Sequence, residues 1–126
     1  MVPPGGPFSG PWVQQPLAPG FREMCRAALL DVTGNCRLDV VLAESEYPDG
    51  PMAWFESTPS GWVEHPLECS LDYAHSLCAW RDMAIGEARV LAGEMAQGGW
   101  GPAMNWNARL LLFTSADGAG ADMSQV

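Results

Sequence analysis

Proline and glycine limit which parts of this chain can form regular structure. Residues 1–20 contain six prolines and four glycines. Proline fixes φ and lacks the backbone N–H donor, so such a segment cannot form a helix or a central strand. We expect 1–20 to be a flexible arm, with docking through Phe8 and Trp12 as the alternative. The rest of this 126-residue chain is short enough for one domain, which we expect to span 21–115.

Apolar periodicity in the remainder predicts two helices. Apolar side chains recur at spacings of three and four residues between Phe21 and Val32, and again between Tyr73 and Met95. This spacing places them on one face of a helix. Glycines after each segment, at Gly34 and at 98–99, would end the helices.

Three short segments between the expected helices have the composition of strands. These are RLDVVLAESE, MAWFES and WVEH, separated by the turn signals YPDGP and TPSG, and Pro66 is expected to end the third strand. WNARLLLFT predicts a last strand, and 116–126 a disordered tail. The predicted order is α-β-β-β-α-β. This is an α+β domain, a mainly antiparallel sheet of about four strands with both helices on one face.

Charge is distributed unevenly along the chain. Fifteen acidic residues face six arginines and no lysine, giving a formal net charge of −9. No basic residue lies between Arg37 and Arg81, where eight acids occur. Because phosphate contacts need clustered Lys and Arg, direct nucleic-acid binding is not expected. Two interpretations of the acids remain, a solvated face that maintains solubility and a surface that attracts a basic partner.

Hydropathy and cysteine usage predict a cytoplasmic protein without membrane contact. The longest apolar runs are far shorter than the roughly twenty residues needed to cross a bilayer. The first residues have neither a basic region nor an apolar core of a secretory signal. Without such a signal, the four cysteines are expected to be reduced thiols in preference to a disulfide framework. They form no CxxC pair, which argues against a zinc ribbon or a thioredoxin motif.

One segment, EHPLECSLDYAHSLC, holds both histidines and two cysteines. Zinc needs four N or S ligands, but the spacing of His65, Cys69, His75 and Cys78 matches no standard zinc motif. A thiol enzyme would use Cys69 with His65 or His75 as its base. No nucleophile elbow, HExxH, phosphate loop or dinucleotide fingerprint is present. We expect no metal, no cofactor and no catalytic residue, with a zinc-stabilised module and a small thiol enzyme as alternatives.

Two family resemblances concern the C-terminal part of the chain. ARVLAGEMAQGGWGPAMNW resembles the C-terminal region of a family of bacterial polymorphic-toxin immunity proteins. Continued through NARLLLF, it also resembles the second helix and following strand of the acidic chaperones of type III secretion. Each resemblance covers about a fifth to a quarter of the chain. Both imply a small acidic protein that holds another protein.

The sequence therefore predicts a non-enzymatic protein that masks or inhibits a partner, in the manner of an immunity protein, antitoxin or inhibitor. The expected partner has a basic surface, as a toxin, nuclease or nucleic-acid-handling complex would, and an acidic secretion-type chaperone is the alternative. Trp54 and Trp62 are the expected aromatic anchors, although Trp54 fits a core position equally well. The sequence does not indicate an oligomeric state. The predicted partner-binding residues are Glu44, Glu46, Asp49, Trp54, Glu56, Trp62, Glu64 and Glu68.

Overall fold

A computed structural model gives the fold of this protein. For Glu68, Cys69 and Met123–Gln125 the structure describes the backbone alone. All regular secondary structure in the described part of the chain is β-strand. The described residues are 6, 9–10, 14–22, 25–95, 108–115 and 123–125. The strands are β1 (Cys25–Leu30), β2 (Asp39–Glu44), β3 (Gly50–Thr58), β4 (Gly61–Leu71), β5 (Ala74–Asp82), β6 (Glu87–Glu94), β7 (Leu110–Ser115) and β8 (Met123–Gln125).

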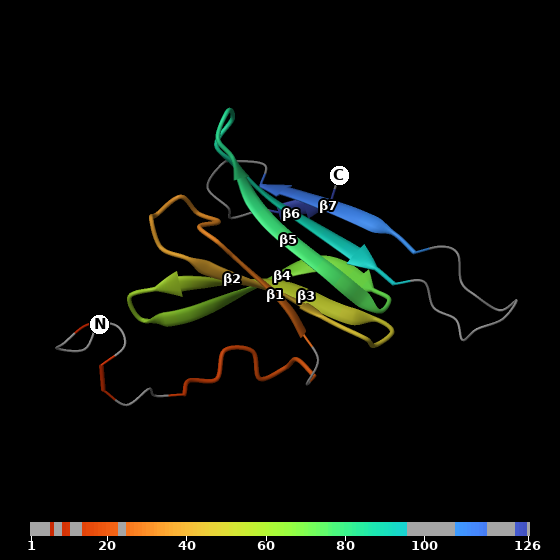
Figure 1. Ribbon diagram of the computed structural model, residues 1–126, viewed down its shortest axis with the longest axis horizontal. Helices are drawn as coiled ribbons and strands as arrows, with labels where there is room; N and C mark the ends of the chain where they lie inside the picture. Colours follow the sequence, from red (N-terminus) through yellow and green to blue (C-terminus); the bar gives the residue numbers. More distant parts are fainter. Residues whose placement is uncertain are drawn as a thin grey trace, which may run out of the picture.

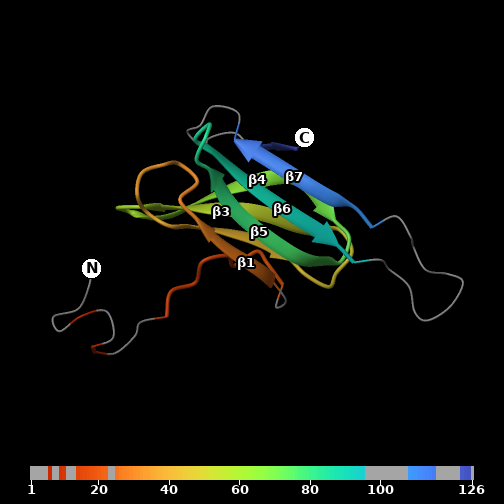
Figure 2. The same ribbon diagram turned by 45° about the horizontal axis from the view of Figure 1, so that its top comes forward.

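These strands form two four-stranded antiparallel sheets, in the order β1-β2-β3-β4 and β5-β6-β7-β8. Within each sheet, every strand pairs with its neighbour in the chain. The second sheet lies across the first at an angle, and β1 lies beside β5 (Figures 1 and 2). The fold is thus two packed meanders, an arrangement that needs only short connections.

A tight corner joins the two sheets. Tyr73, at the corner, has a φ of 54°, and its N–H donates to the carbonyl of Tyr47 at 2.8 Å. Next to it, the Ser45 hydroxyl donates to the Ala74 carbonyl at 2.6 Å, and these two residues also form an isolated parallel bridge. The end of β2 is thereby fixed to the start of β5.

The core lies between the two sheets and is filled by alternate residues of the strands. Small alanines let the sheets approach, while Trp54 and Phe113 fill the space between them. Both large side chains are almost completely buried. The first sheet contributes Val41, Ala43, Met52, Trp54, Leu67 and Leu71. The second contributes Ala74, Ala88, Val90, Ala92, Leu111 and Phe113.

The predicted α+β class is wrong, because both expected helices are strands. The segment from Phe21 to Val32 contains β1, and the segment from Tyr73 to Met95 is the β5–β6 hairpin. Gly86 has a φ of +75° in the hairpin turn, a conformation that a right-handed helix excludes. The strand β6 also carries the start of the segment on which both family resemblances rest. Residues 96–106 of that segment lie outside the described residues, and its continuation through NARLLLF reaches into β7.

The strands β2 and β3 occur where strands were expected, but β4 is longer than predicted. Pro66 does not end it: β4 continues to Leu71, and Pro66 pairs with Ala53. Proline is tolerated there because β4 is at the edge of its sheet, where one N–H needs no ladder partner. Pro51 in the central strand β3 lies at a register shift between Gly50 and Met52.

The described part of the proline-rich arm lies on the side of the first sheet that faces away from the second (Figures 1 and 2). Phe21 packs edge-on against Phe55, with ring centroids 6.0 Å apart. Phe8 and Trp12, the expected docking residues of the arm, lie outside the described residues. In the predicted tail, the described segment is β8, which pairs with β7.

Candidate functional site

The β2–β3 turn presents acidic side chains at one end of the first sheet. Glu46 and Asp49 are exposed there, with positive φ values of 66° and 52°. Glu46 lies 3.5 Å from the guanidinium of Arg26, and both side chains are substantially exposed. An ion pair of this kind contributes little to stability and leaves the carboxylate accessible to solvent.

Glu44, next to this turn, has a structural role. Its side chain is only 2% exposed, and its carboxylate accepts the backbone N–H of Arg22 at 3.0 Å together with the Arg22 guanidinium. That guanidinium also lies 4.1 Å from the ring centroid of Tyr47, a cation–π contact. The hydrogen bond to Glu44 raises the pKa of Arg22, so the guanidinium remains charged. Glu44 therefore holds residues 14–22 against the first sheet. Its prediction as a partner-binding residue is wrong, because its side chain is buried.

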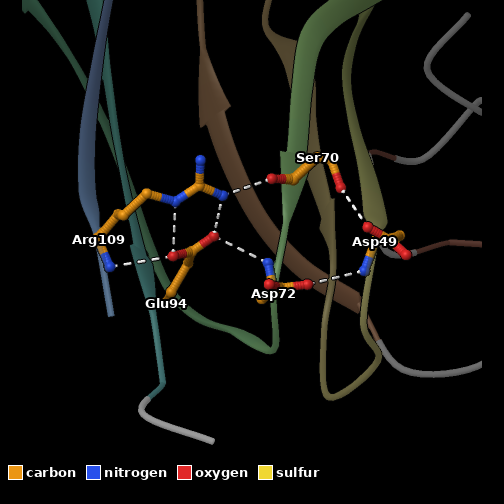
Figure 3. A network of polar contacts seen from close by, with 5 residues as sticks. All are labelled: Asp49, Ser70, Asp72, Glu94 and Arg109. Atoms are coloured by element: carbon orange, nitrogen blue, oxygen red, sulfur yellow. Dashed lines mark hydrogen bonds and ion pairs between the residues drawn. The ribbon is translucent and has the colours of Figure 1, made fainter. Parts of the chain in front are cut away.

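A second buried carboxylate organises the corner between the sheets (Figure 3). The Glu94 side chain is 3% exposed and forms an ion pair with Arg109, whose Nε is 2.9 Å from Oε2. The same carboxylate accepts the backbone N–H of Asp72 at 2.8 Å and that of Arg109 at 3.0 Å. The hydrogen bond from Arg109 is the largest cause of a lowered Glu94 pKa.

The network of Glu94 continues to the β2–β3 turn. Arg109 donates to the carbonyl of Ser70 at 2.6 Å, and the Ser70 hydroxyl donates to Asp49 at 3.0 Å. The Asp49 N–H in turn donates to the Asp72 carboxylate at 3.1 Å (Figure 3). These contacts join four segments of the chain: the β2–β3 turn, the end of β4 with the β4–β5 connection, the end of β6 and the residue before β7.

The other end of the first sheet presents apolar side chains to solvent. Trp62, on the β3–β4 hairpin, is 41% exposed, and Leu29 on β1 is 61% exposed. The registers Leu29↔Val40, Val40↔Phe55 and Phe55↔Glu64 place Leu29 and Glu64 on the same face, turned away from the core. Glu64 is exposed there.

Leu38 extends this surface. Leu38 is exposed and immediately precedes β2. Because side chains alternate between the two faces of a strand, Leu38 lies on the same outer face as Val40. Trp62 pairs with Ser57, which shares the outer face with Phe55 two residues before it. We name this set, Leu29, Leu38, Trp62 and Glu64, the hairpin surface.

Trp54 is not part of this surface. It occupies a core position, which was the alternative to its prediction as a partner-binding residue. It is 1% exposed, and its ring is stacked on that of His65, with centroids 4.0 Å apart and planes 6° apart. The His65 Nε2 lies 3.1 Å from a carboxylate oxygen of Glu56. Glu56 and His65 thus form a half-buried pair on the inner side of the hairpin, opposite to Trp62.

The eight predicted residues therefore do not form one site. Glu46 and Asp49 precede β3, while Glu64 and Trp62 pair with Phe55 and Ser57 farther along it. At about 3.3 Å per residue, these two positions are roughly 17 and 23 Å from the start of β3. The side chain of Glu68 lies outside the described part.

The histidines and cysteines of the EHPLECSLDYAHSLC segment are spread over two strands. His65 is on β4, whereas His75 and Cys78 are on β5, where both are exposed. A spacing of three, which aligns side chains on a helix, does not align them on a strand. Among the described side chains, which exclude that of Cys69, no three His, Cys, Asp or Glu residues are grouped closely enough to share a metal ion.

Leu29 and Leu38 were missed as surface residues. Leu29 falls in the segment whose apolar spacing predicts a helix, and Leu38 falls in the predicted strand RLDVVLAESE. Alternation in CRAALL, in which Arg26, Ala28 and Leu30 share one face, could have placed Leu29 on the opposite face with Ala27. The sequence does not show which of the two faces is covered.

No protein-family model matches this chain, and neither a curated protein nor a solved structure is found to be similar to it. Within the described ranges, the protein has no helix of the length and apolar character that a membrane span requires. A functional assignment consequently depends on the surfaces described above.

Proposed function

We propose that this protein is a non-enzymatic binding domain that masks or inhibits a basic partner protein through the hairpin surface. Trp62, Leu29 and Leu38 serve as apolar anchors, and Glu64 lies beside them. An exposed tryptophan with a polar surround is the typical composition of an interface hot spot. The observation that carries the proposal is the exposure of Trp62 on a strongly acidic sheet.

The charge of the first sheet supports a basic partner. Residues 25–72 contain nine acids and two arginines. Glu44 is buried and paired with Arg22, but Glu64 and Glu46, the latter beside Arg26, remain exposed. An unbalanced acidic surface attracts a basic protein and raises its association rate by about 10- to 1,000-fold at low salt.

The compartment we propose is the cytoplasm. Three of the four cysteines, Cys25, Cys36 and Cys78, are described as free thiols, and burial raises the pKa of Cys25. Free thiols persist where glutathione and thioredoxin keep them reduced. Basic nucleases and nucleic-acid-handling proteins are partners of suitable charge in that compartment.

Affinity enrichment tests the proposal. The full chain is immobilised, proteins from the source organism are captured, and the recovered proteins are identified by mass spectrometry. The same capture uses Trp62→Ser, with Met83→Ser as a control because Met83 is exposed on the β5–β6 turn. We expect a basic protein whose affinity, measured by calorimetry, falls at least about tenfold with Trp62→Ser and is unchanged with Met83→Ser. Equal binding by all three proteins would contradict the proposal.

A further inference from the structure

The outer face of the second sheet carries apolar side chains in register across three strands. The inner face is identified by Ala79, Val90 and Phe113, which are paired with one another and pack in the core. Residues at alternate positions therefore face outward. Cys78 pairs with Leu91, and Leu91 pairs with Leu112, which gives a continuous apolar row across β5, β6 and β7.

Exposed apolar residues flank this row on both sides. Trp80 pairs with Arg89 on one side, and Leu110 pairs with Gly93 on the other. The side chains of Trp80 and Leu110 are both exposed. We name Cys78, Trp80, Leu91, Leu110 and Leu112 the outer apolar face. Monomeric proteins rarely expose a contiguous apolar patch of this kind without an interaction partner.

Small residues lie beside this row at one end of β5 and β6. Ser76 and Gly93 are paired in register, and the Ser76 hydroxyl occupies the space above the glycine. Sheet faces pack against one another at a usual separation of about 10 Å.

The difference in charge between the two sheets indicates which face is suited to contact a second copy of the chain. Residues 74–95 and 108–115 contain three arginines and three acids, whereas 25–72 contain nine acids and two arginines. On the outer face, the Arg89 guanidinium pairs with Asp82 at 3.2 Å and Glu87 at 3.7 Å. Two copies that met through their first sheets would repel each other. Two copies that met through their second sheets would bring together apolar surfaces of much lower net charge.

We infer that this protein forms a symmetrical dimer in which the outer apolar faces of two copies pack against each other. Such an isologous contact uses the same patch on both chains and buries Trp80, Leu91 and Leu112 of each. The inference does not rest on the proposed function. It places the two hairpin surfaces on opposite outer sides of the dimer, where they could engage two partner sites together.

Sedimentation velocity of the full chain over a range of concentrations tests the inference. We expect a species of twice the 13.6 kDa chain mass. Trp80→Arg, which introduces two like charges at the two-fold interface, is expected to weaken the dimer at least about tenfold. Leu29→Arg is the matched control, because Leu29 is an exposed residue on the outer face of the first sheet. This control should leave the dimer unchanged.

Alkylation of the wild-type protein gives a second readout that does not depend on the folding of a variant. Cys78 is exposed in a single chain but lies in the row that the dimer would cover, while Cys36 is exposed in the loop before β2. The rate at which iodoacetamide modifies Cys78 should fall several-fold as protein concentration rises, whereas the rate at Cys36 should stay constant. A single-chain mass at all concentrations, a dimer unaffected by Trp80→Arg in a folded variant, or a concentration-independent rate at Cys78 would overturn the inference.

Discussion

The Glu94 carboxylate and the Arg109 guanidinium form an ion pair that closes the corner between the two sheets (Figure 3). Glu94 ends β6, and Arg109 immediately precedes β7. The same carboxylate accepts the N–H of Asp72 from the connection between β4 and β5. One buried acid thus holds together three segments that are distant in sequence.

Loss of this carboxylate should destabilise the fold. Glu94→Gln keeps the side-chain shape but removes the charge that Arg109 and two backbone N–H groups contact. We expect the free energy of unfolding, measured by urea denaturation, to fall by about 1 to 3 kcal/mol. Glu46→Gln, at an exposed ion pair, should change it by less than about 0.5 kcal/mol. Equal effects of the two substitutions would contradict the structural role of Glu94.

The lowered pKa of Glu94 predicts that the stability of the protein depends on pH. Because its folded pKa is lowered, the carboxylate stabilises the folded state above its unfolded pKa and loses this contribution as pH falls through the folded value. Between about pH 5 and pH 3, the melting temperature of the wild type should decrease more than that of Glu94→Gln. Parallel melting curves for the two proteins over this range would show that Glu94 does not couple folding to protonation.

Substitution of Trp54 should destabilise the protein far more than substitution of Trp62. Trp54→Ala leaves a cavity in the core and is expected to cost about 3 to 5 kcal/mol of unfolding free energy. Trp62→Ala removes a side chain that is 41% exposed and should cost less than about 1 kcal/mol. Urea denaturation of both variants measures the difference. A larger loss for Trp62 would mean that the hairpin surface is part of the core.

These two tryptophans also show how far the sequence predicts this protein. Strand alternation and turn residues correctly indicated β2, β3 and the start of β4. Trp54 and Trp62, however, both belong to predicted strands, and only the register of β3 and β4 shows that they face opposite sides. The burial of Trp54 depends on the second sheet, of which the sequence indicated only β7, in WNARLLLFT.

The strands β5 and β6 were not predicted because their apolar residues fit both the helical spacing of three to four residues and the strand spacing of two residues. Leu77 and Trp80 lie three apart, as on a helix, while Leu77 and Ala79 alternate, as on a strand. Alanine at 88 and 92 favours a helix by intrinsic propensity, but here it forms the thin inner face of β6. Packing against the first sheet favours the strand over the helix in this segment. The hydrogen-bond network around Glu94 was not predicted because it joins residues from segments that are distant in sequence.

The contact between Arg22 and Glu44 should protect the start of the domain from proteolysis. Arg22 is held by the buried Glu44 carboxylate and lies over Tyr47. In Glu44→Gln, trypsin should cleave after Arg22 several-fold faster than in the wild type, because local opening becomes easier. Cleavage after Arg37, which is exposed in a separate loop, provides the internal reference and should be unchanged. Equal cleavage after Arg22 in both proteins would show that Glu44 does not hold this segment.

Gly50 should not tolerate a side chain. A Cβ atom there would lie 2.8 Å from the backbone oxygen of Glu44 and 3.3 Å from that of Leu71. Because both contacts are to backbone, Gly50→Ala must shift strands, and we expect a loss of about 1 to 3 kcal/mol in thermal or urea unfolding. Gly20→Ala is the control, since nothing lies within 4 Å of its added Cβ. A stable Gly50→Ala variant would contradict the close approach of β2 and β3 at this point.

The most direct test of the hairpin surface as a binding site for basic proteins is an NMR titration with an arginine-rich peptide that also contains leucine. The amide signals of the full chain are followed as the peptide is added, at low salt and at several-fold higher salt. We predict that the largest shifts occur at Leu29, Leu38, Trp62 and Glu64, and that they diminish at high salt. Shifts confined to β5, β6 and β7, or spread evenly over the acidic residues without preference for Trp62, would contradict the proposed function.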